Sequence, residues 1–422
     1  MNKKNLNSVT PAGLIIALGI IYGDIGTSPL YVFNAIIYNK LVSESLILGS
    51  LSCIIWTITM QTTVKYVLMI LRADNRGEGG IFALYALVRR RSKWLVYPAM
   101  VGGAALLADG IITPPISITS AVEGLRKLPL MHAINNNTIM IIVLIIIVLF
   151  FFMQQFGTAS IGKMFGPVMF IWFSMLAILG AAHIMDDLTI FKALNPIYAI
   201  NFLSTYPSGF WLLGAVFLCS TGAEALYSDL GHCGRGNIRI SWIFVKSCLL
   251  LNYIGQGSYL LAHRTGLTIT DTVKDTLHIN AFYDLMPEWF VVIGVVIATV
   301  AAIIASQAMV SGSFTLISES MRLNLWPKLK IKYPSEEKGQ LFIPAINTMI
   351  FCGCVAVVLY FQTSSRMEAA YGLAIIVTMI ATTVLFANYM VIHRAKRVFV
   401  YLFLIVYGAI EVTFLISLLQ KF

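Results

Sequence analysis

Four carboxylates lie inside long apolar runs that carry almost no other charge. They are Asp24 in IIYGDIGTSPLYVF, Asp109 and Glu123 in LLADGIITPPISITSAVEGL, and Glu224 in LCSTGAEALYSDLG. A charged side chain at the centre of a bilayer is costly, so an acid at that depth indicates a functional site. Each acid is accompanied by Gly, Pro, Ser or Thr, which interrupt helices and offer oxygen atoms. This combination predicts the transport of a cation.

Asp24 is flanked by residues that interrupt a helix. Gly23 and Gly26 permit an unwound backbone, and Pro29 frees a carbonyl one turn earlier. We expect the carbonyls of residues 22–25 to lack intrahelical partners. Together with the carboxylate, they could replace the hydration shell of a weakly hydrated cation, as carbonyl rings do in potassium filters. Alternatively, Asp24 caps the second half-helix by accepting its free N–H groups, and the two roles can coexist.

A second group of oxygen atoms is predicted on the apolar run from 95 to 124. Asp109, Thr113 and Ser117 are spaced by four residues, so they lie on one face of a helix. Hydroxyl groups alone often only pack helices together, but an acid in the same register favours a cation-binding face. Glu123 is about 21 Å further along the helix and is predicted to line the access path or to act in gating.

Thr221 and Glu224 are predicted to lie one turn apart on one helical face. A buried carboxyl group can hold a proton until a cation replaces it, which is the physical basis of proton coupling. The alternative is a permanently neutral Glu224 that makes structural hydrogen bonds. Two lysines in other spans, Lys65 and Lys246, are expected to extend their ammonium groups to the membrane interface. Glu411 is expected to make a polar contact between helices.

Membrane-spanning helices must position these residues. Apolar residues make up 58% of the 422 positions and charged residues only 11%, which is typical of a polytopic membrane protein. About 20 apolar residues cross the hydrocarbon core, and in lipid such a segment must be a helix. Eleven spans are predicted, at residues 12–38, 46–71, 95–124, 138–156, 164–183, 209–229, 240–262, 288–317, 342–361, 369–391 and 399–420.

The placement of Lys and Arg predicts the orientation of the chain. Of the 29 such residues, 19 fall in the segments that face the cytoplasm if the N-terminus is inside, 8 fall on the opposite side and 2 fall within spans. Because cytoplasmic loops are enriched in Lys and Arg, this bias predicts a cytoplasmic N-terminus, with Phe422 outside. The same bias explains the net charge of +10, which therefore does not indicate binding to nucleic acid.

The first and sixth spans are both interrupted near an acid. Interrupted helices at corresponding places in two halves indicate an inverted-repeat transporter with its site at the repeat interface. We therefore expect an all-α fold with a cytoplasmic N-terminus at residues 1–11, a ten-helix transport core at 12–391 and an additional transmembrane helix at 399–420. The two repeats are expected at about 12–183 and 209–391.

The sequence does not indicate an enzyme. The six histidines form no H-E-x-x-H motif, and neither G-x-S-x-G nor a P-loop is present. We predict no catalytic residues, no cofactor and no metal site other than one for the transported ion. The six cysteines lie in or beside apolar segments and are predicted to be small buried residues.

Five longer motifs carry a family resemblance, namely IYGDIGTSPLYVF, GEGGIFALYAL, ADGIITPPISITSAVEGL, TGAEALYSDLGHCGR and SQAMVSGSFTL. These motifs occur in the same order as in the KUP/HAK/KT potassium uptake permeases, which the chain resembles from about residue 12 to 420. The resemblance implies a LeuT-like 5+5 inverted-repeat fold of the amino acid–polyamine–organocation superfamily. It also implies proton-coupled potassium import through the plasma membrane.

The resemblance further implies a set of potassium ligands and a set of acids needed for transport. The implied ligands are Asp24, Tyr31, Thr113, Ser117, Thr221, Glu224 and Tyr371. The acids implied for proton coupling or gating are Asp24, Asp109, Glu123 and Glu224. Members of this family usually have a twelfth span and a cytoplasmic C-terminal domain, whereas this chain stops after its eleventh predicted span. We expect the ten-helix core and its ion site to be complete, and a homodimer remains possible.

We therefore predict K⁺ uptake by proton symport through alternating access in a multi-pass protein of the plasma membrane. The expected partners are the potassium ion, the proton and the lipid bilayer. Two alternatives remain open: a cationic amino-acid or polyamine permease of the same architecture, and a passive K⁺ pathway. The acid at the first break argues against a site for a substrate carboxylate, whereas a polyamine is compatible with the acids.

Overall fold

The protein is described by a computed structural model that covers residues 8–128, 131, 134–154, 159–333 and 341–421. Its named regular elements in these residues are helices. Among the described residues, ten helical stretches are long and apolar enough to cross a membrane, and the bent pair Pro11–Ile20 and Gly23–Leu30 makes an eleventh if it is counted as one span. An all-α protein with multiple membrane spans is thus confirmed.

Each predicted apolar window corresponds to one helix or to a chain of consecutive helices. In chain order these are α1 (Pro11–Ile20) with α2 (Gly23–Thr27), η1 (Ser28–Leu30) and α3 (Val32–Ile37); α4 (Glu44–Thr57) with the π-helix η2 (Ile58–Met69) and η3 (Ile70–Arg72); η4 (Lys93–Leu95) with α6 (Val96–Glu123) and η5 (Gly124–Lys127); α7 (Asn136–Gln154); α8 (Ala159–His183); α10 (Gly209–Phe217) with η9 (Leu218–Ser220) and α11 (Ala223–Ser228); α13 (Arg235–Arg264); α15 (Glu288–Arg322); α16 (Pro344–Phe361); α17 (Ser364–Ile392); and α18 (Arg397–Leu419).

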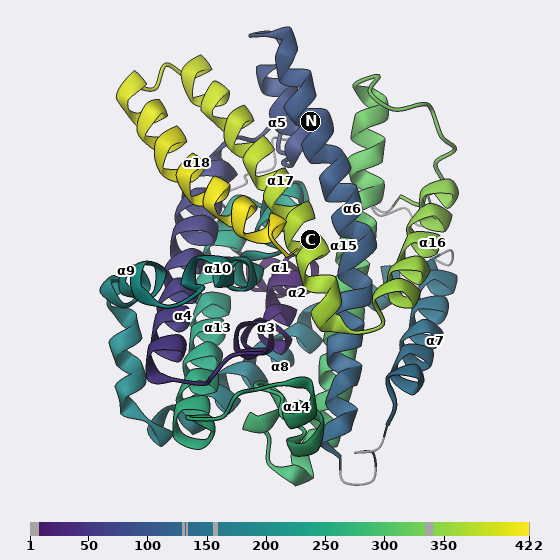
Figure 1. Ribbon diagram of the computed structural model, residues 1–422. Coiled ribbons are helices and arrows are strands. Elements are labelled where there is room, and N and C mark those ends of the chain that lie inside the picture. Colours follow the sequence, from purple (N-terminus) through teal and green to yellow (C-terminus); the bar gives the residue numbers. More distant parts are fainter. Residues whose placement is uncertain (1–7, 129–130, 132–133, 155–158, 334–340, 422) are drawn as a thin grey trace.

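Shorter helices connect the spans. They are α5 (Ile81–Val88), η7 (Ile184–Asp186), η8 (Leu188–Leu194), α9 (Pro196–Thr205), α12 (Leu230–Cys233), α14 (Asp271–Leu277) and η10 (Tyr283–Leu285). The long helix α6 packs against α15 and α17, while α8 packs against α1 and α13. The broken first span, α1 to α3, therefore lies in the middle of the bundle, and α18 lies against α17 and α10 (Figure 1).

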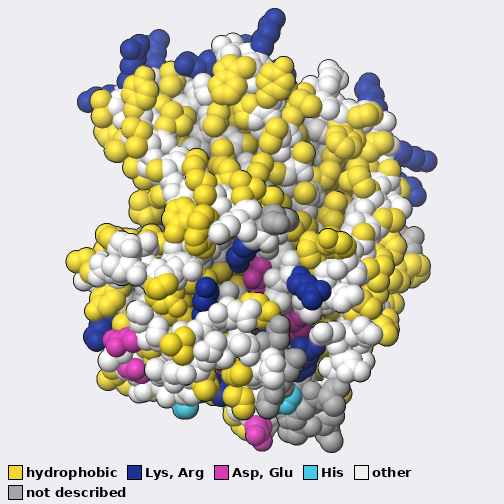
Figure 2. Space-filling model, in the orientation of Figure 1, with side chains coloured by type: hydrophobic (Ala, Val, Ile, Leu, Met, Phe, Trp, Pro, Cys, Tyr) yellow, Lys and Arg dark blue, Asp and Glu magenta, His cyan; other side chains and the backbone are white. Residues whose placement is uncertain are grey.

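Charged side chains are distributed unevenly between the two ends of the bundle. In the view of Figure 2, the charged side chains visible along the rim formed by the α5–α6 and α17–α18 connections are Lys and Arg, whereas acidic side chains are visible, together with basic ones, in the opposite half. We call these two ends the basic rim and the acidic end. Cytoplasmic loops are enriched in Lys and Arg, so this is the distribution expected if the basic rim faces the cytoplasm.

Candidate cation-binding site

The first span is bent where the sequence predicts an interruption. The axes of α1 and of the α2–η1 segment differ by 65°. Gly23 is required here because a Cβ on this residue would lie 2.6 Å from the Cα of Ala305 in α15. The expectation of unpartnered carbonyls is wrong at two positions, however. The Tyr22 carbonyl accepts the Gly26 N–H at 2.9 Å, and the Asp24 carbonyl accepts the Thr27 hydroxyl at 2.9 Å.

The sixth span is interrupted between η9 and α11. Thr221 is extended, with φ −58° and ψ 147°, and Gly222 has a left-handed φ of +82°. The two interruptions face each other, because a Cβ on Gly222 would lie 2.7 Å from the Ile25 nitrogen and 3.2 Å from Oδ2 of Asp24. Glycine is therefore needed at 222 both for its backbone conformation and for the close approach of the first span.

Asp24 is buried between these two interruptions, with 2% of its surface exposed. The Tyr371 hydroxyl of α17 donates to its Oδ1 at 2.6 Å. Among the described residues, Oδ2 has no hydrogen-bond partner. Asp24 lies in the first turn of α2 but makes no side-chain capping bond there. This geometry leaves one carboxylate oxygen available to a ligand beside the break in the sixth span.

Five hydroxyl groups cluster at the helix break that contains Asp24, and two of them, on Thr27 and Ser28, donate to its backbone carbonyl. The Ser28 and Thr221 oxygens are 3.0 Å apart, and the Tyr31 oxygen lies 3.3 Å from Ser28 and 3.4 Å from Thr221. Thr27 contacts Ser117 of α6 at 3.3 Å. The structure thus brings together predicted residues from the first, third, sixth and tenth spans. Sequence analysis missed Thr27 and Ser28, although both stand in the motif that contains Asp24.

Of the predicted face of α6, formed by Asp109, Thr113 and Ser117, only Ser117 contacts this cluster in the described residues. Asp109 is 3% exposed and its Oδ1 accepts the Thr113 hydroxyl at 2.8 Å, so these two residues pair with each other on their own helix. Pro115 cannot donate to the Ile111 carbonyl. That carbonyl accepts instead from the Cys354 thiol of α16 at 3.2 Å. The oxygen freed by this proline is therefore used in helix packing.

Glu224 lies at the start of α11 and is 3% exposed. The Tyr66 hydroxyl of η2 donates to its Oε1, and its Oε2 has no hydrogen-bond partner among the described residues. Like Asp24, Glu224 therefore has one oxygen held by a tyrosine and one left over. Tyr66 was missed in the sequence, where an aromatic residue in an apolar span is indistinguishable from a packing residue.

Two acids lie towards the acidic end of the bundle. Glu123 accepts the Ser364 N–H at 3.1 Å and the Ser364 hydroxyl at 2.6 Å, so it caps the first turn of α17. Glu368, which sequence analysis overlooked, is 5% exposed and lies one turn before Tyr371. No ion pair within 4.0 Å is made by Glu368 in the described part of the chain, and its charged neighbours include Lys274 and Glu123. The sequence feature that could have identified Glu368 is its position as an acid three residues before Tyr371.

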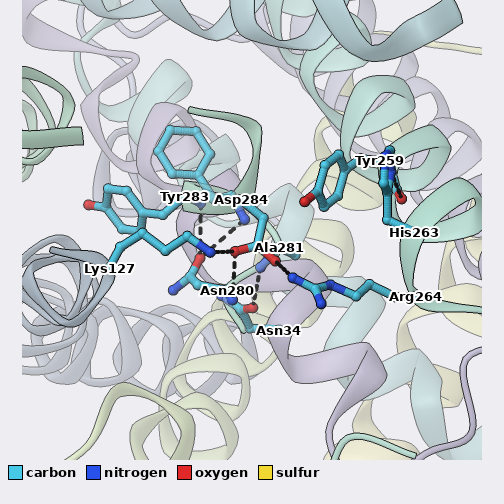
Figure 3. A network of polar contacts seen from close by, with 10 residues as sticks. Asn34, Lys127, Tyr259, His263, Arg264, Asn280, Ala281, Tyr283 and Asp284 are labelled. Atoms are coloured by element: carbon cyan, nitrogen blue, oxygen red, sulfur yellow. Dashed lines mark hydrogen bonds and ion pairs between the residues drawn. The ribbon is translucent and has the colours of Figure 1, made fainter. Parts of the chain in front are cut away.

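The acidic end is closed by a polar network around Asp284 (Figure 3). The Asp284 side chain is fully buried and pairs with Lys127 at 2.5 Å and with Arg264 at 3.2 Å. In the same segment, the Ala281 N–H donates to Asn34 of α3 at 2.9 Å. The network therefore ties the connection before α15 to the ends of the first, third and seventh spans.

Tyr283 belongs to the same segment and covers the end of α6. Its hydroxyl donates to the Ala121 carbonyl at 2.8 Å, and a Cβ on Gly124 would lie 2.3 Å from its ring. Burial, and to a smaller degree the carboxylate of Glu123, raises the pKa of Tyr283, so the hydroxyl keeps its proton and remains a donor. A cavity of about 290 Å³ lies beside it, lined among others by Glu123 and Lys274.

Replacing Asp284 by Ala is expected to destabilise the fold by about 2 kcal/mol, because Lys127 and Arg264 lose their shared partner. The cost is below that of a fully buried pair since these cations keep 25% and 18% of their side-chain surface exposed. Thermal unfolding in detergent measures it. Glu44→Ala is the control, because its ion pair with Lys192 is exposed on both sides and contributes at most about 1 kcal/mol. Equal stabilities of the two variants would contradict this role.

The clustered donor set is of the kind that binds a hard cation. In the residues that the structure describes, no group of three or more His, Cys, Asp or Glu side chains could hold a metal ion. The clustered ligands are hydroxyl and carboxylate oxygens, which are hard donors. Asp24 is the acid at the first helix break, where these hydroxyl groups cluster.

Comparison with known proteins identifies close relatives. A family model described as the K+ potassium transporter integral membrane domain matches residues 11–422. The chain is 60% identical to a probable potassium transport system protein Kup of Cytophaga hutchinsonii, over 98% of this chain and 62% of the relative. It is 57% identical to the corresponding protein of Flavobacterium johnsoniae, over 99% of this chain and 63% of the relative. The chain therefore spans a little under two thirds of the length of these curated relatives.

More distant likenesses agree with this result. A probable potassium transport system protein Kup of Clostridium perfringens is 52% identical over the whole chain and 64% of its own length. Among solved structures, a mutant of the manganese transporter of Eremococcus coleocola superposes with a TM-score of 0.50 at 12% identity. The match covers 99% of this chain and 86% of that one. At this identity the likeness concerns the fold alone.

Proposed function

We propose, because this chain belongs to the K+ potassium transporter family, that it takes up potassium ions across the plasma membrane. The observation that carries the proposal is a buried carboxylate oxygen without a hydrogen-bond partner in the described residues, Oδ2 of Asp24, at two facing helix breaks that also carry a cluster of hydroxyl groups. Such a cluster can exchange its contacts for contacts to a cation that gives up its water.

The proposed ion site combines residues from four spans. Asp24 supplies the negative charge, and the hydroxyl groups of Tyr31 and Thr221, 3.4 Å apart, belong to the cluster at the same helix breaks. Glu224 has an unpartnered oxygen at the start of α11, close to the same break. The full proposed ligand set is Asp24, Tyr31, Thr113, Ser117, Thr221, Glu224 and Tyr371, with Ser28 added from the geometry.

We propose proton symport as the coupling mechanism. Asp24, Asp109 and Glu224 are all buried carboxyl groups that no basic side chain pairs with in the described residues. A proton can neutralise such a group when no cation is near, and an arriving cation can displace it. One of these three acids therefore carries the proton. Glu123 is proposed to act at the access path through its contact with α17.

The proposed architecture is a 5+5 inverted repeat over residues 12–391 that works by alternating access. The broken spans α1–α3 and α10–α11 occupy corresponding positions in the two proposed repeats, which supports this arrangement. The basic rim is proposed to face the cytoplasm. The N-terminus, of which residues 1–7 lie outside the described residues, is proposed to be cytoplasmic as well. A homodimer is compatible with this arrangement.

Flux of Rb⁺ into proteoliposomes under an imposed pH gradient, with the sodium gradient held at zero, tests the proposal. We expect Rb⁺ to accumulate beyond the level that the membrane voltage allows and to follow the proton gradient. Accumulation that stops at the voltage-determined level would indicate a passive K⁺ pathway. Competition by caesium but not by spermidine is expected, and the reverse result would indicate a polyamine permease.

A further inference from the structure

A buried ion pair joins α18 to the π-helix η2. Lys65 is fully buried and pairs with Glu411, which is 1% exposed. The expectation that Lys65 extends to the membrane interface is therefore wrong. The same ammonium group donates to the Met379 carbonyl at 3.2 Å, and the Thr383 hydroxyl donates to Glu411 at 2.9 Å. Because both Met379 and Thr383 belong to α17, the pair lies where three spans meet.

This pair is connected to the proposed ion site through one aromatic ring. The Lys65 ammonium group lies 4.8 Å from the centroid of the Tyr66 ring, and the Tyr66 hydroxyl donates to Oε1 of Glu224. A continuous series of contacts therefore runs from Glu411 through Lys65 and Tyr66 to Glu224. Each member is at most 3% exposed, so water does not screen the contacts.

The local helix geometry directs the two neighbouring side chains to different partners. Lys65 and Tyr66 are consecutive residues of the twelve-residue π-helix Ile58–Met69. π-Helical segments are uncommon and often lie at functional sites. Lys65 reaches Glu411 on α18 while Tyr66 reaches Glu224 on α11. The two side chains of this segment thus contact different spans while the ammonium group lies next to the Tyr66 ring.

We propose that Glu411 is a positioning residue for the ion site, which it reaches through Lys65 and Tyr66. The ion pair holds the Tyr66 ring so that its hydroxyl engages Oε1 of Glu224 and leaves Oε2 to the ion. The eleventh span thereby takes part in cation binding without touching the cation. This inference rests on the proposed function, since it concerns how Glu224 is oriented for the transported ion.

A double-mutant cycle on Glu411 and Tyr66 tests the proposal. The apparent affinity for Rb⁺ is measured both as the KM of uptake and as binding to the purified full chain. We expect Glu411→Gln and Tyr66→Phe each to lower the affinity for Rb⁺ about tenfold. The double variant is expected to have the same affinity as the single variant that binds Rb⁺ less tightly. If the two residues act through one series of contacts, their effects cannot add.

Tyr407→Phe is the matched control. Tyr407 lies one turn before Glu411 on α18, and its hydroxyl also bonds to η2, at the Met60 carbonyl, but in the described residues it makes no hydrogen bond or ring contact with Tyr66. We expect its affinity for Rb⁺ to change less than about twofold. A general loosening of α18 from η2 would instead weaken binding equally in the control and in Glu411→Gln, and that result would overturn the proposal.

A buried lysine without a partner can prevent folding. If Glu411→Gln yields little folded protein, the double substitution Lys65→Gln/Glu411→Gln replaces it in the cycle, because it leaves no uncompensated charge. We again expect its effect on the affinity for Rb⁺ not to add to that of Tyr66→Phe. Additive effects of about a hundredfold, with wild-type protein active, would refute the positioning role and leave the proposed function intact. A wild-type protein that neither binds nor transports Rb⁺ would refute the proposed function itself.

Discussion

Replacing Asp24 by Asn is expected to reduce Rb⁺ uptake more than about a hundredfold. The substitution removes the charge that compensates the cation, which in a partly desolvated site is worth several kcal/mol. It keeps the size of the side chain and an acceptor for the Tyr371 hydroxyl, which lies 2.6 Å from Oδ1. The fold should therefore be retained, and the loss should be in binding and transport.

Growth of a potassium-uptake-deficient cell at low potassium, together with Rb⁺ uptake at matched expression, measures this effect. Glu44→Gln serves as the control because Glu44 is an exposed acid at the start of α4 and its side chain is 61% exposed. Full growth of the Asp24→Asn strain at low potassium would remove Asp24 from the ion site.

Replacing Gly222 by Ala is expected to reduce uptake at least about tenfold, since a binding site tolerates shifts of only about 0.5 Å. The new Cβ would lie 2.7 Å from the Ile25 nitrogen and 3.0 Å from the Cβ of Asp24, so the first span must move away from the sixth. The φ of +82° at Gly222 adds a backbone cost of about 1–2 kcal/mol for alanine. Both effects separate the two helix breaks.

Gly266→Ala separates backbone strain from the steric effect. Gly266 also has a positive φ, of +86°, but in the described part of the chain no atom beyond its own chain neighbours lies within 4 Å of the position of its Cβ. We expect this variant to lose stability in thermal unfolding while its affinity for Rb⁺ stays within about twofold of wild type. If Gly222→Ala also kept wild-type affinity, the two breaks would not form one site.

The acids and the helix breaks could be predicted from the sequence because their signals are strong in a hydrocarbon environment. A carboxylate such as Asp24 or Glu224 stands out among apolar residues, and Gly and Pro mark where a helix is interrupted. The eleven apolar windows coincide with the candidate spans among the described residues, because long apolar runs are an equally strong signal. What the pattern could not supply was the partner of each oxygen.

The expected ring of free carbonyls illustrates this limit. The first span bends at residues 21–22 and then resumes as the short helix α2, so the Tyr22 carbonyl finds a partner within the helix. The residues that hold the buried oxygens in place are hydroxyl groups from other spans, among them Tyr371 on Asp24 and Tyr66 on Glu224. Contacts between distant spans leave no trace in local spacing.

The polar contact expected for Glu411 is confirmed, but Lys65 was misjudged for a related reason. Taken singly, a lysine in a span is expected to extend to the interface. The two residues are 346 positions apart, and only the fold shows that they neutralise each other. The π-helix that presents Lys65 and Tyr66 to different neighbours likewise has no recognised sequence signature in this segment.

The most direct test is to locate Rb⁺ itself by anomalous X-ray scattering from crystals of the protein grown in rubidium. We expect one peak at the two facing helix breaks, within bonding distance of Oδ2 of Asp24 and of the Thr221 hydroxyl, and no such peak in Asp24→Asn. A peak away from both breaks in a protein that still transports Rb⁺ would contradict the assignment of the site.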